Sequence, residues 1–225
     1  MPDTSGRLLG TRFDAADIGD RDGALGCLEL YKCLLRAGEE VVMMPLLHGL
    51  LMEQMNIDVV ELGSGCGIAG IGLAQIIPGS KVLLSDLEEA QGIIAKNIKH
   101  ASLAFKSSLK QEVLDWNQPL SATEDHKKVD LLILCECIYN ADSDPALISI
   151  LQQFINYSPQ VKILVITKRR HFSETEFFDL MEKAGIPILE QCLLPLPHHF
   201  SEADFELPKV EIYLYGAIQP EKDWE

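Results

Sequence analysis

The chain has 225 residues, 47% of them hydrophobic, which is enough for one large domain with a buried core. Its formal net charge of −15 at pH 7 disfavours a nucleic-acid partner, because phosphate backbones are bound chiefly through Lys and Arg. No apolar run reaches the roughly 18 residues of a membrane span, and residues 1–10 do not resemble a secretory signal, so we expect a soluble, cytoplasmic protein that does not contact membranes.

The first part of the chain gives weak signals. Residues 1–22 are polar and rich in Gly and Asp, which predicts a loose arm or a short hairpin, and residues 24–36 fit a helix or a pair of strands equally. From Met43 to Met55 apolar residues recur at helical spacing, with Pro45 near the start, where proline is tolerated. We therefore divide the chain into an N-terminal arm, residues 1–42, and a main domain, residues 43–225.

Strand-like and helix-like segments alternate through the main domain. Strands are predicted over 57–62, 81–85, 110–115, 129–135 and 161–167, and helices over 67–77, 87–101, 144–156 and 174–184. Two last strand runs, 186–194 and 210–217, have no helical pattern between them. The alternation predicts an α/β fold, with a mostly parallel sheet covered by helices on both faces and an antiparallel hairpin at one edge.

The six cysteines show no Cys-x-x-Cys pair and no spacing typical of a disulfide framework. We expect all six to be reduced, small core residues. Cys135 and Cys137 would share one face of a strand, so a metal pair is conceivable, but no further ligands are evident and we predict no metal site.

The run from Val59 to Gly70 reads as a buried strand that breaks into a glycine loop and opens a helix. Such a loop lets backbone N–H groups approach a nucleotide-like ligand, because glycine has no Cβ and tolerates positive φ. The last glycines match the dinucleotide pattern G-x-G-x-x-G, but Gly63 already follows the strand directly and Glu61 stands two residues before it. An ordinary tight turn between strand and helix is the alternative.

Two further strand ends carry acidic residues. Asp86 follows the glycines by about 20 residues, where a carboxylate can accept from both ribose hydroxyls of a nucleotide. Asp86 and Glu89 also fit a helix capping box, which is the structural alternative. Asp115 and Trp116 close the third predicted strand, and a Trp there can equally be a core residue.

These features resemble a known enzyme family. The pattern E-x-G-x-G-x-G at Glu61 resembles the first motif of S-adenosylmethionine-dependent methyltransferases with a Rossmann-like fold. The sequence Glu136-Cys137-Ile138-Tyr139 narrows the resemblance to the seven-β-strand protein methyltransferases called family 16, whose lysine-modifying members carry D-x-x-Y at this place. The resemblance covers about residues 40–217, takes in Asn97, and implies the strand order 3-2-1-4-5-7-6.

The resemblance implies a cofactor, a substrate and a set of site residues. The cofactor is S-adenosylmethionine, with Asp115 accepting from the adenine amino group and Trp116 bordering the ring. The substrate is a lysine of a protein such as a chaperone, an ATPase or a translation factor, and we expect a monomeric enzyme. The cofactor-binding residues are Met44, Glu61, Gly63, Gly65, Gly67, Asp86, Asp115, Trp116 and Cys135.

Glu136 and Tyr139 are the predicted catalytic residues. Tyr139 would line the lysine channel, where desolvation favours the neutral amine, and Glu136 would capture and orient the incoming ammonium. The chain departs from the family pattern at two positions, because Glu136 replaces Asp and Met44 replaces the Trp that precedes Pro. A small-molecule amine methyltransferase and a non-catalytic, cofactor-binding adaptor are the alternatives.

Overall fold

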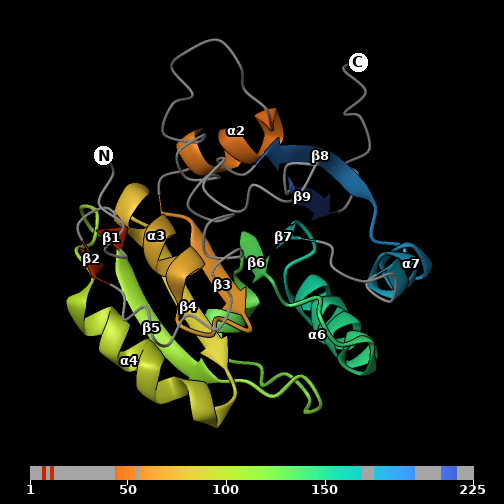
Figure 1. Ribbon diagram of the computed structural model, residues 1–225, viewed down its shortest axis with the longest axis horizontal. Coiled ribbons are helices and arrows are strands. Elements are labelled where there is room, and N and C mark those ends of the chain that lie inside the picture. Colours follow the sequence, from red (N-terminus) through yellow and green to blue (C-terminus); the bar gives the residue numbers. More distant parts are fainter. Residues whose placement is uncertain are drawn as a thin grey trace, which may run out of the picture.

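A seven-stranded sheet forms the centre of the protein (Figure 1). The computed structural model describes residues 7–8, 11–12, 44–53, 56–168, 175–195 and 209–216. In sheet order the strands are β5 (Ser108–Val113), β4 (Lys81–Asp86), β3 (Asp58–Leu62), β6 (Leu131–Cys135), β7 (Lys162–Thr167), β9 (Lys209–Gly216) and β8 (Ile188–Pro195). Counted along the chain from β3, this is the order 3-2-1-4-5-7-6 that the resemblance implies.

Strands β5, β4, β3, β6 and β7 pair in parallel, whereas β9 runs antiparallel to both of its neighbours. In the central register, Val60 lies between Leu83 and Leu132. The parallel strands therefore end at one edge of the sheet, where the predicted ligand-binding residues follow them. The predicted α/β fold with a C-terminal antiparallel hairpin is confirmed.

Helices cover both faces of this sheet, because successive strand residues point to opposite sides. Val59 and Leu131 pack in one core cluster with residues of α2, α3 and α4, whereas Val60 and Leu132 pack in a second cluster with α6 and α7. Figure 1 shows α3 and α4 on one side of the strands and α6 and α7 on the other. The helices are α2 (Pro45–Glu53), α3 (Ile68–Ile76), α4 (Gln91–His100), α5 (Glu124–Lys127), α6 (Asp144–Tyr157) and α7 (Thr175–Lys183), and the 3₁₀ turns are η1 (Glu88–Ala90) and η2 (Ala141–Ser143).

A side chain from a distant strand holds the first turn of helix α2. The carboxylate of Glu190 in β8 accepts the backbone N–H of Leu46 at 2.7 Å and that of Leu47 at 3.1 Å. The first N–H groups of a helix have no partner within the helix, and negative charge is favourable there. Glu190 thus joins the helix that precedes the sheet to the hairpin that completes it.

Two details differ from the sequence prediction. Strand β5 ends at Val113, so Asp115 lies beyond the strand instead of closing it. Buried Leu114, whose N–H donates to the Asp86 carbonyl at 2.9 Å, resembles a strand residue in sequence although it belongs to the following loop.

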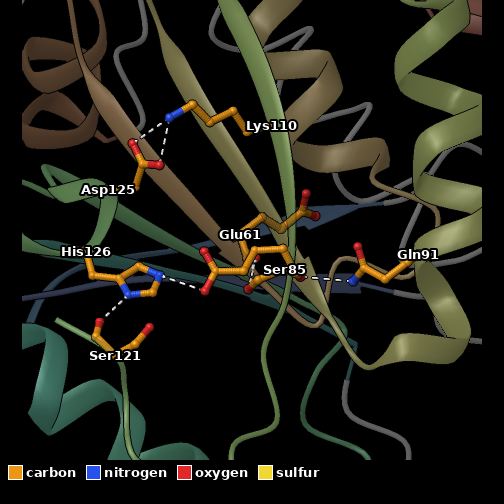
Figure 2. Close-up of polar contacts among 8 residues, drawn as sticks. Glu61, Ser85, Gln91, Lys110, Ser121, Asp125 and His126 are labelled. Carbon is orange, nitrogen blue, oxygen red and sulfur yellow. Dashed lines mark hydrogen bonds and ion pairs between the residues drawn. The ribbon is translucent and has the colours of Figure 1, made fainter. Parts of the chain in front are cut away.

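The short helix α5 was not predicted, because its sequence has only four helical residues and no apolar period. Tertiary contacts fix it (Figure 2): Lys110 of β5 pairs with Asp125 at 2.7 Å, and buried His126 lies against Phe154 of α6. The imidazole Nδ1 lies 2.6 Å from the Ser121 carbonyl, and Nε2 lies 3.3 Å from a Glu112 carboxylate oxygen. Helix α5 therefore depends on contacts that sequence periodicity does not record.

The terminal predictions fall largely outside the described residues. Of the predicted arm, β1 (Arg7–Leu8) and β2 (Thr11–Arg12) are described and form an antiparallel pair, in agreement with a short hairpin. The helix-or-strand segment 24–36 lies outside the described ranges, as do residues 169–174 and 196–208. Within the described part of the chain, no helix combines the length and the apolar character that crossing a bilayer requires.

Candidate active site

The loop between β3 and α3 is built on three glycines with left-handed backbones. Gly63, Gly65 and Gly67 have φ values of 62°, 55° and 79°. A Cβ on Gly63 would lie 3.0 Å from the Cys137 sulfur and 3.1 Å from Trp116 Cζ2, whereas a Cβ on Gly65 would meet no atom within 4 Å. Gly63 therefore permits close packing beneath the loop, and Gly65 faces open space into which a ligand fits.

Glu61 lies buried beneath this loop, with 1% of its surface exposed. Its Oε2 accepts the backbone N–H of Gly70 at 2.9 Å, and this bond ties β3 to α3. Burial raises the pKa of Glu61 to about 8, and nearby Asp86 contributes in the same direction, while the Gly70 N–H and Ser64 oppose the shift. Glu61 is therefore mostly protonated at neutral pH in the unliganded protein.

Asp86 stands at the carboxyl end of β4. Its Oδ2 accepts the Gly65 N–H at 2.7 Å, and its Oδ1 accepts the Leu87 N–H at 2.7 Å. The N-cap position of η1 is Leu87, with no side-chain cap, so Asp86 does not form the alternative capping box with Glu89. The carboxylate is instead fixed against the glycine loop at the ligand side.

Asp115 forms a local turn with Asn117. Its Oδ1 accepts the Asn117 backbone N–H at 2.9 Å and the Asn117 side-chain amide at 3.0 Å. These hydrogen bonds hold the pKa of Asp115 below its ordinary value, so the residue is a hydrogen-bond acceptor at neutral pH. The neighbouring Trp116 is half-buried and packs against the second core cluster.

The end of β6 is fixed in an unusual conformation. Glu136 has a φ of 56°, in the left-handed region that a residue with a Cβ seldom adopts. Its N–H donates to the Ile166 carbonyl at 2.9 Å, and its Oε1 accepts the Lys168 N–H at 2.9 Å, so both contacts reach the end of β7. Tyr139, three residues later, is 71% exposed. Residues in such strained backbone conformations persist only where surrounding contacts hold them, and they are frequent at functional sites.

A cavity of about 480 Å³ joins these strand ends, within the roughly 300–1,000 Å³ of small-molecule sites. Most of the predicted site residues line it, namely Glu61, Gly63, Gly65, Asp86, Asp115, Trp116, Cys135, Glu136 and Tyr139. The structure thus brings together residues that are up to 78 positions apart in sequence, from Glu61 to Tyr139. The cavity is the candidate active site.

Two predicted residues do not line the cavity. Gly67 donates its N–H to the Ser64 carbonyl at 2.7 Å, and a Cβ on it would lie 3.0 Å from Leu84, so its place is in the fold of the loop. Met44 is buried in the core cluster that contains Leu47, and the structure does not bring it to the cavity. The basic residues that follow Lys168 in sequence lie outside the described residues.

Three polar residues support the site from behind: Ser85 and Gln91, which no sequence motif marks, and Asn97, which the family resemblance includes. Figure 2 shows two of them, Ser85 against Glu61 and Gln91 directed at the strand ends. Ser85 Oγ donates to the Glu61 carbonyl at 2.7 Å, and Gln91 donates to the carbonyls of Asp86 and Glu112 at 3.0 and 2.9 Å. The buried amide of Asn97 donates to the Cys66 carbonyl at 2.8 Å, which gives that residue a role in holding the glycine loop. A polar residue on the buried face of a helix is the signal that marks both Gln91 and Asn97.

The cysteines at the cavity differ in state. Cys66 and Cys137 are thiols, whereas Cys135 takes part in a disulfide bond, so the expectation that all six are reduced is wrong for Cys135. The Cys137 thiol donates to the Leu62 carbonyl at 3.0 Å, and burial raises its pKa. Cys137 is therefore a neutral packing residue under the loop and not a nucleophile.

Comparison with known proteins agrees with the family that the sequence motifs resemble. Residues 40–184 match the lysine methyltransferase family. The chain is 28% identical over 130 residues to a UPF0665 family protein of Schizosaccharomyces pombe, covering 58% of this chain and 39% of that protein. It is 27% identical over 144 residues to the protein-lysine N-methyltransferase EFM6 of Saccharomyces cerevisiae, covering 59% of this chain and 57% of that protein.

The fold agrees with a solved methyltransferase. The magnesium protoporphyrin IX methyltransferase of Synechocystis, crystallised with S-adenosylmethionine, has a TM-score of 0.54 at 16% identity, covering 94% of this chain and 89% of that one. The match spans only 39% and 57% of the length of the two relatives named above. Because residues 40–184 make up well over half of its 225 positions, the chain belongs to the lysine methyltransferase family, whose cofactor is S-adenosylmethionine.

Proposed function

We infer that this protein transfers a methyl group from S-adenosylmethionine to the side-chain amine of a lysine in a protein substrate. The observation that carries the inference is one cavity lined both by Asp86 and by the Glu136–Tyr139 corner. Membership of the lysine methyltransferase family supports the same chemistry. Asp86 would serve the nucleoside, and the Glu136–Tyr139 corner would serve the acceptor.

The cavity suits the cofactor by shape and charge. Asp86 offers carboxylate oxygens for the ribose hydroxyls, Asp115 offers an acceptor for the adenine amino group, and the open side of Gly65 leaves room for the chain between them. Among the described residues that line the cavity, none is Lys or Arg, which favours a ligand that carries positive charge. When bound, the cofactor supplies a methyl group already activated by its sulfonium.

The Glu136–Tyr139 corner suits an amine acceptor. A free lysine has a pKa of about 10.4, so holding its amine neutral at pH 7 costs about 4.6 kcal/mol. A tyrosine ring against the lysine stem excludes water, and both this desolvation and a nearby sulfonium lower the lysine pKa. Glu136 opposes deprotonation by its charge, so its proposed task is to capture and orient the ammonium before the proton leaves.

The exposure of Tyr139 favours a macromolecular substrate over a free amine. At 71% exposure the ring stands at the mouth of the cavity, where the side chain of a docked protein reaches it from outside. A small amine would instead need walls that bury most of its surface. The monomeric state and the cytoplasmic location expected from the sequence stay predictions.

Labelling in a cell lysate tests the proposal. Recombinant protein is incubated with lysate and S-adenosylmethionine labelled in the methyl group, and labelled products are separated by size and located by mass spectrometry. We expect label on lysine of a discrete protein, its loss with Asp86→Ala, and its retention with the exposed control Glu124→Gln. Label in the small-molecule fraction would point to a free amine, and cofactor binding without any labelled product would point to an adaptor.

A further inference from the structure

Glu61 is an ionisable residue in the inner wall of the cavity. The proposed methyl transfer assigns no chemical role to it. Its side chain is buried beneath the glycine loop and contacts α3 through the Gly70 N–H at 2.9 Å. It also lines the cavity. Because Glu61 itself is buried, a charge placed beside it in the cavity is screened less than it would be in water.

Among the residues that the structure describes, the charged side chains lining the cavity around Glu61 are all acidic. Helix α3, which packs over it, contains no ionisable residue. The ionisable side chains of the described residues that line the cavity from the other elements are Cys66, Asp86, Asp115, Glu136, Cys137 and Tyr139. The described part of this lining contains four carboxyl groups and neither Lys nor Arg, so none of these side chains supplies a cation to compensate an ionised Glu61. Desolvation, with Asp86 nearby, accordingly keeps the proton on Glu61 up to a pKa of about 8.

The cofactor changes this balance because it brings a sulfonium and an ammonium. A cation near a buried carboxyl group favours the ionised form. We propose that binding of S-adenosylmethionine expels the proton of Glu61 to solvent, and that this exchange lets the cavity discriminate the sulfonium cofactor from its thioether product. The O–H bond of the Glu61 carboxyl breaks and the proton passes to buffer, with no change of oxidation state. When the product leaves, Glu61 takes up a proton again.

The exchange has a consequence for turnover. Methyl transfer removes the sulfonium charge, so an ionised Glu61 loses part of its electrostatic partner as soon as the product forms. S-adenosylhomocysteine, which keeps the ammonium but lacks the sulfonium, should therefore expel less of the Glu61 proton than the cofactor does. This inference rests on the cofactor of the family and holds whatever amine accepts the methyl group.

Calorimetry counts the expelled protons directly. Binding is measured at pH 7 in buffers of different ionisation enthalpy, and the dependence of the observed heat on that enthalpy gives the number released. For a pKa that falls from about 8 to well below neutrality, we expect about 0.9 proton per S-adenosylmethionine at pH 7. We also expect the Kd to fall about tenfold from pH 6 to pH 7, where the α-ammonium of the cofactor stays mostly charged.

Matched variants assign the proton. Glu61→Gln should release none and show a pH-independent Kd, whereas Glu124→Gln, an exposed residue outside the cavity, should behave as the wild type. S-adenosylhomocysteine should release clearly less than S-adenosylmethionine from the wild-type protein. Difference infrared spectra of the wild type, which need no variant, should lose a protonated-carboxyl band when the cofactor binds.

Three results would overturn the inference: heats that do not depend on the buffer, equal release with both ligands, or full release from a folded Glu61→Gln protein. Failure of S-adenosylmethionine to bind at all would overturn it too and would refute the proposed function as well. Binding without proton release would refute the exchange alone. The two failures are thus distinguishable in one set of titrations.

Discussion

Gly70 is the position at which the smallest change should disturb the site most. A Cβ added there would lie 2.4 Å from Leu84 Cδ2, 2.9 Å from Val82 Cγ1 and 2.7 Å from Glu61 Oε2. These atoms belong to the packed interface of α3 with β3 and β4, so Gly70→Ala must displace these buried side chains or push the helix away from the sheet. The same movement would lengthen the Gly70–Glu61 hydrogen bond and shift the glycine loop.

The magnitude follows from three terms. Overpacking a filled core costs about 1–3 kcal/mol, and weakening one buried hydrogen bond costs about 0.5–1.5 kcal/mol. Replacing a helical glycine by alanine returns about 0.5–1 kcal/mol through the smaller backbone entropy of the unfolded chain. Together these terms give a loss of about 0.5–4 kcal/mol, so we expect Gly70→Ala to lower the free energy of unfolding by about 2 kcal/mol and to weaken cofactor binding.

Urea unfolding followed by circular dichroism measures the first effect, and calorimetry with S-adenosylmethionine measures the second. Gly92→Ala is the matched control, because Gly92 is an exposed residue of α4 whose added Cβ would meet nothing within 4 Å. That control should gain about 0.5–1 kcal/mol and bind cofactor normally. If Gly70→Ala were as stable as Gly92→Ala, the close approach of α3 to β4 would not be as described.

Three further predictions concern the residues of the cavity. Asp86→Ala should weaken S-adenosylmethionine binding about 100-fold in calorimetry, because hydrogen bonds to a charged acceptor contribute about 1.5–3 kcal/mol each, and wild-type affinity would contradict the ribose assignment. Tyr139→Ala should leave the cofactor Kd within about twofold and lower methyl transfer more than 100-fold, a loss above 2.7 kcal/mol of transition-state stabilisation; loss of both would make Tyr139 a structural residue. The pKa of Glu61 rises from 4.5 to about 8 on folding, so between these pH values the folded protein holds a proton that the unfolded chain releases. The contribution of Glu61 to the free energy of unfolding therefore falls as the pH rises from 4.5 to 8, by up to about 5 kcal/mol. Unfolding of Glu61→Gln compared with wild type at pH 5 and pH 8 isolates that contribution, and parallel pH profiles would show that Glu61 is ionised in the folded protein.

The sequence predicts the central sheet well because its strands are apolar throughout and alternate with helices. The run Val59 to Leu62 has no polar residue except Glu61, and the glycines that follow end the strand unambiguously. Edge strand β5 is harder, since only Leu109 and Glu112 are partly buried and the apolar Leu114 directly follows the strand. The sequence pattern therefore predicts the end of β5 at Asp115, two residues beyond Val113, where the strand ends.

Side-chain chemistry at the site depends on contacts that no local pattern contains. The left-handed backbone of Glu136 exists because the end of β7 holds its N–H and its carboxylate. The raised pKa of Glu61 exists because a helix without charges covers it. A family pattern identifies both residues but does not indicate these properties. Met44 shows the converse, since its position in the pattern predicted a cofactor contact and the structure places it in the core.

The Glu190 carboxylate that secures the start of α2 also sets an order of events during synthesis. The residues it joins are 143 and 144 positions apart, so most of the chain emerges from the ribosome before that helix obtains its anchor. Until then, the last hairpin cannot add Leu194, Val210 and Ile212 to the core that α2 helps to build. Nascent chains that stop short of β8 should consequently expose the apolar side of α2 and become clients of chaperones, whereas chains that include the hairpin should resist protease.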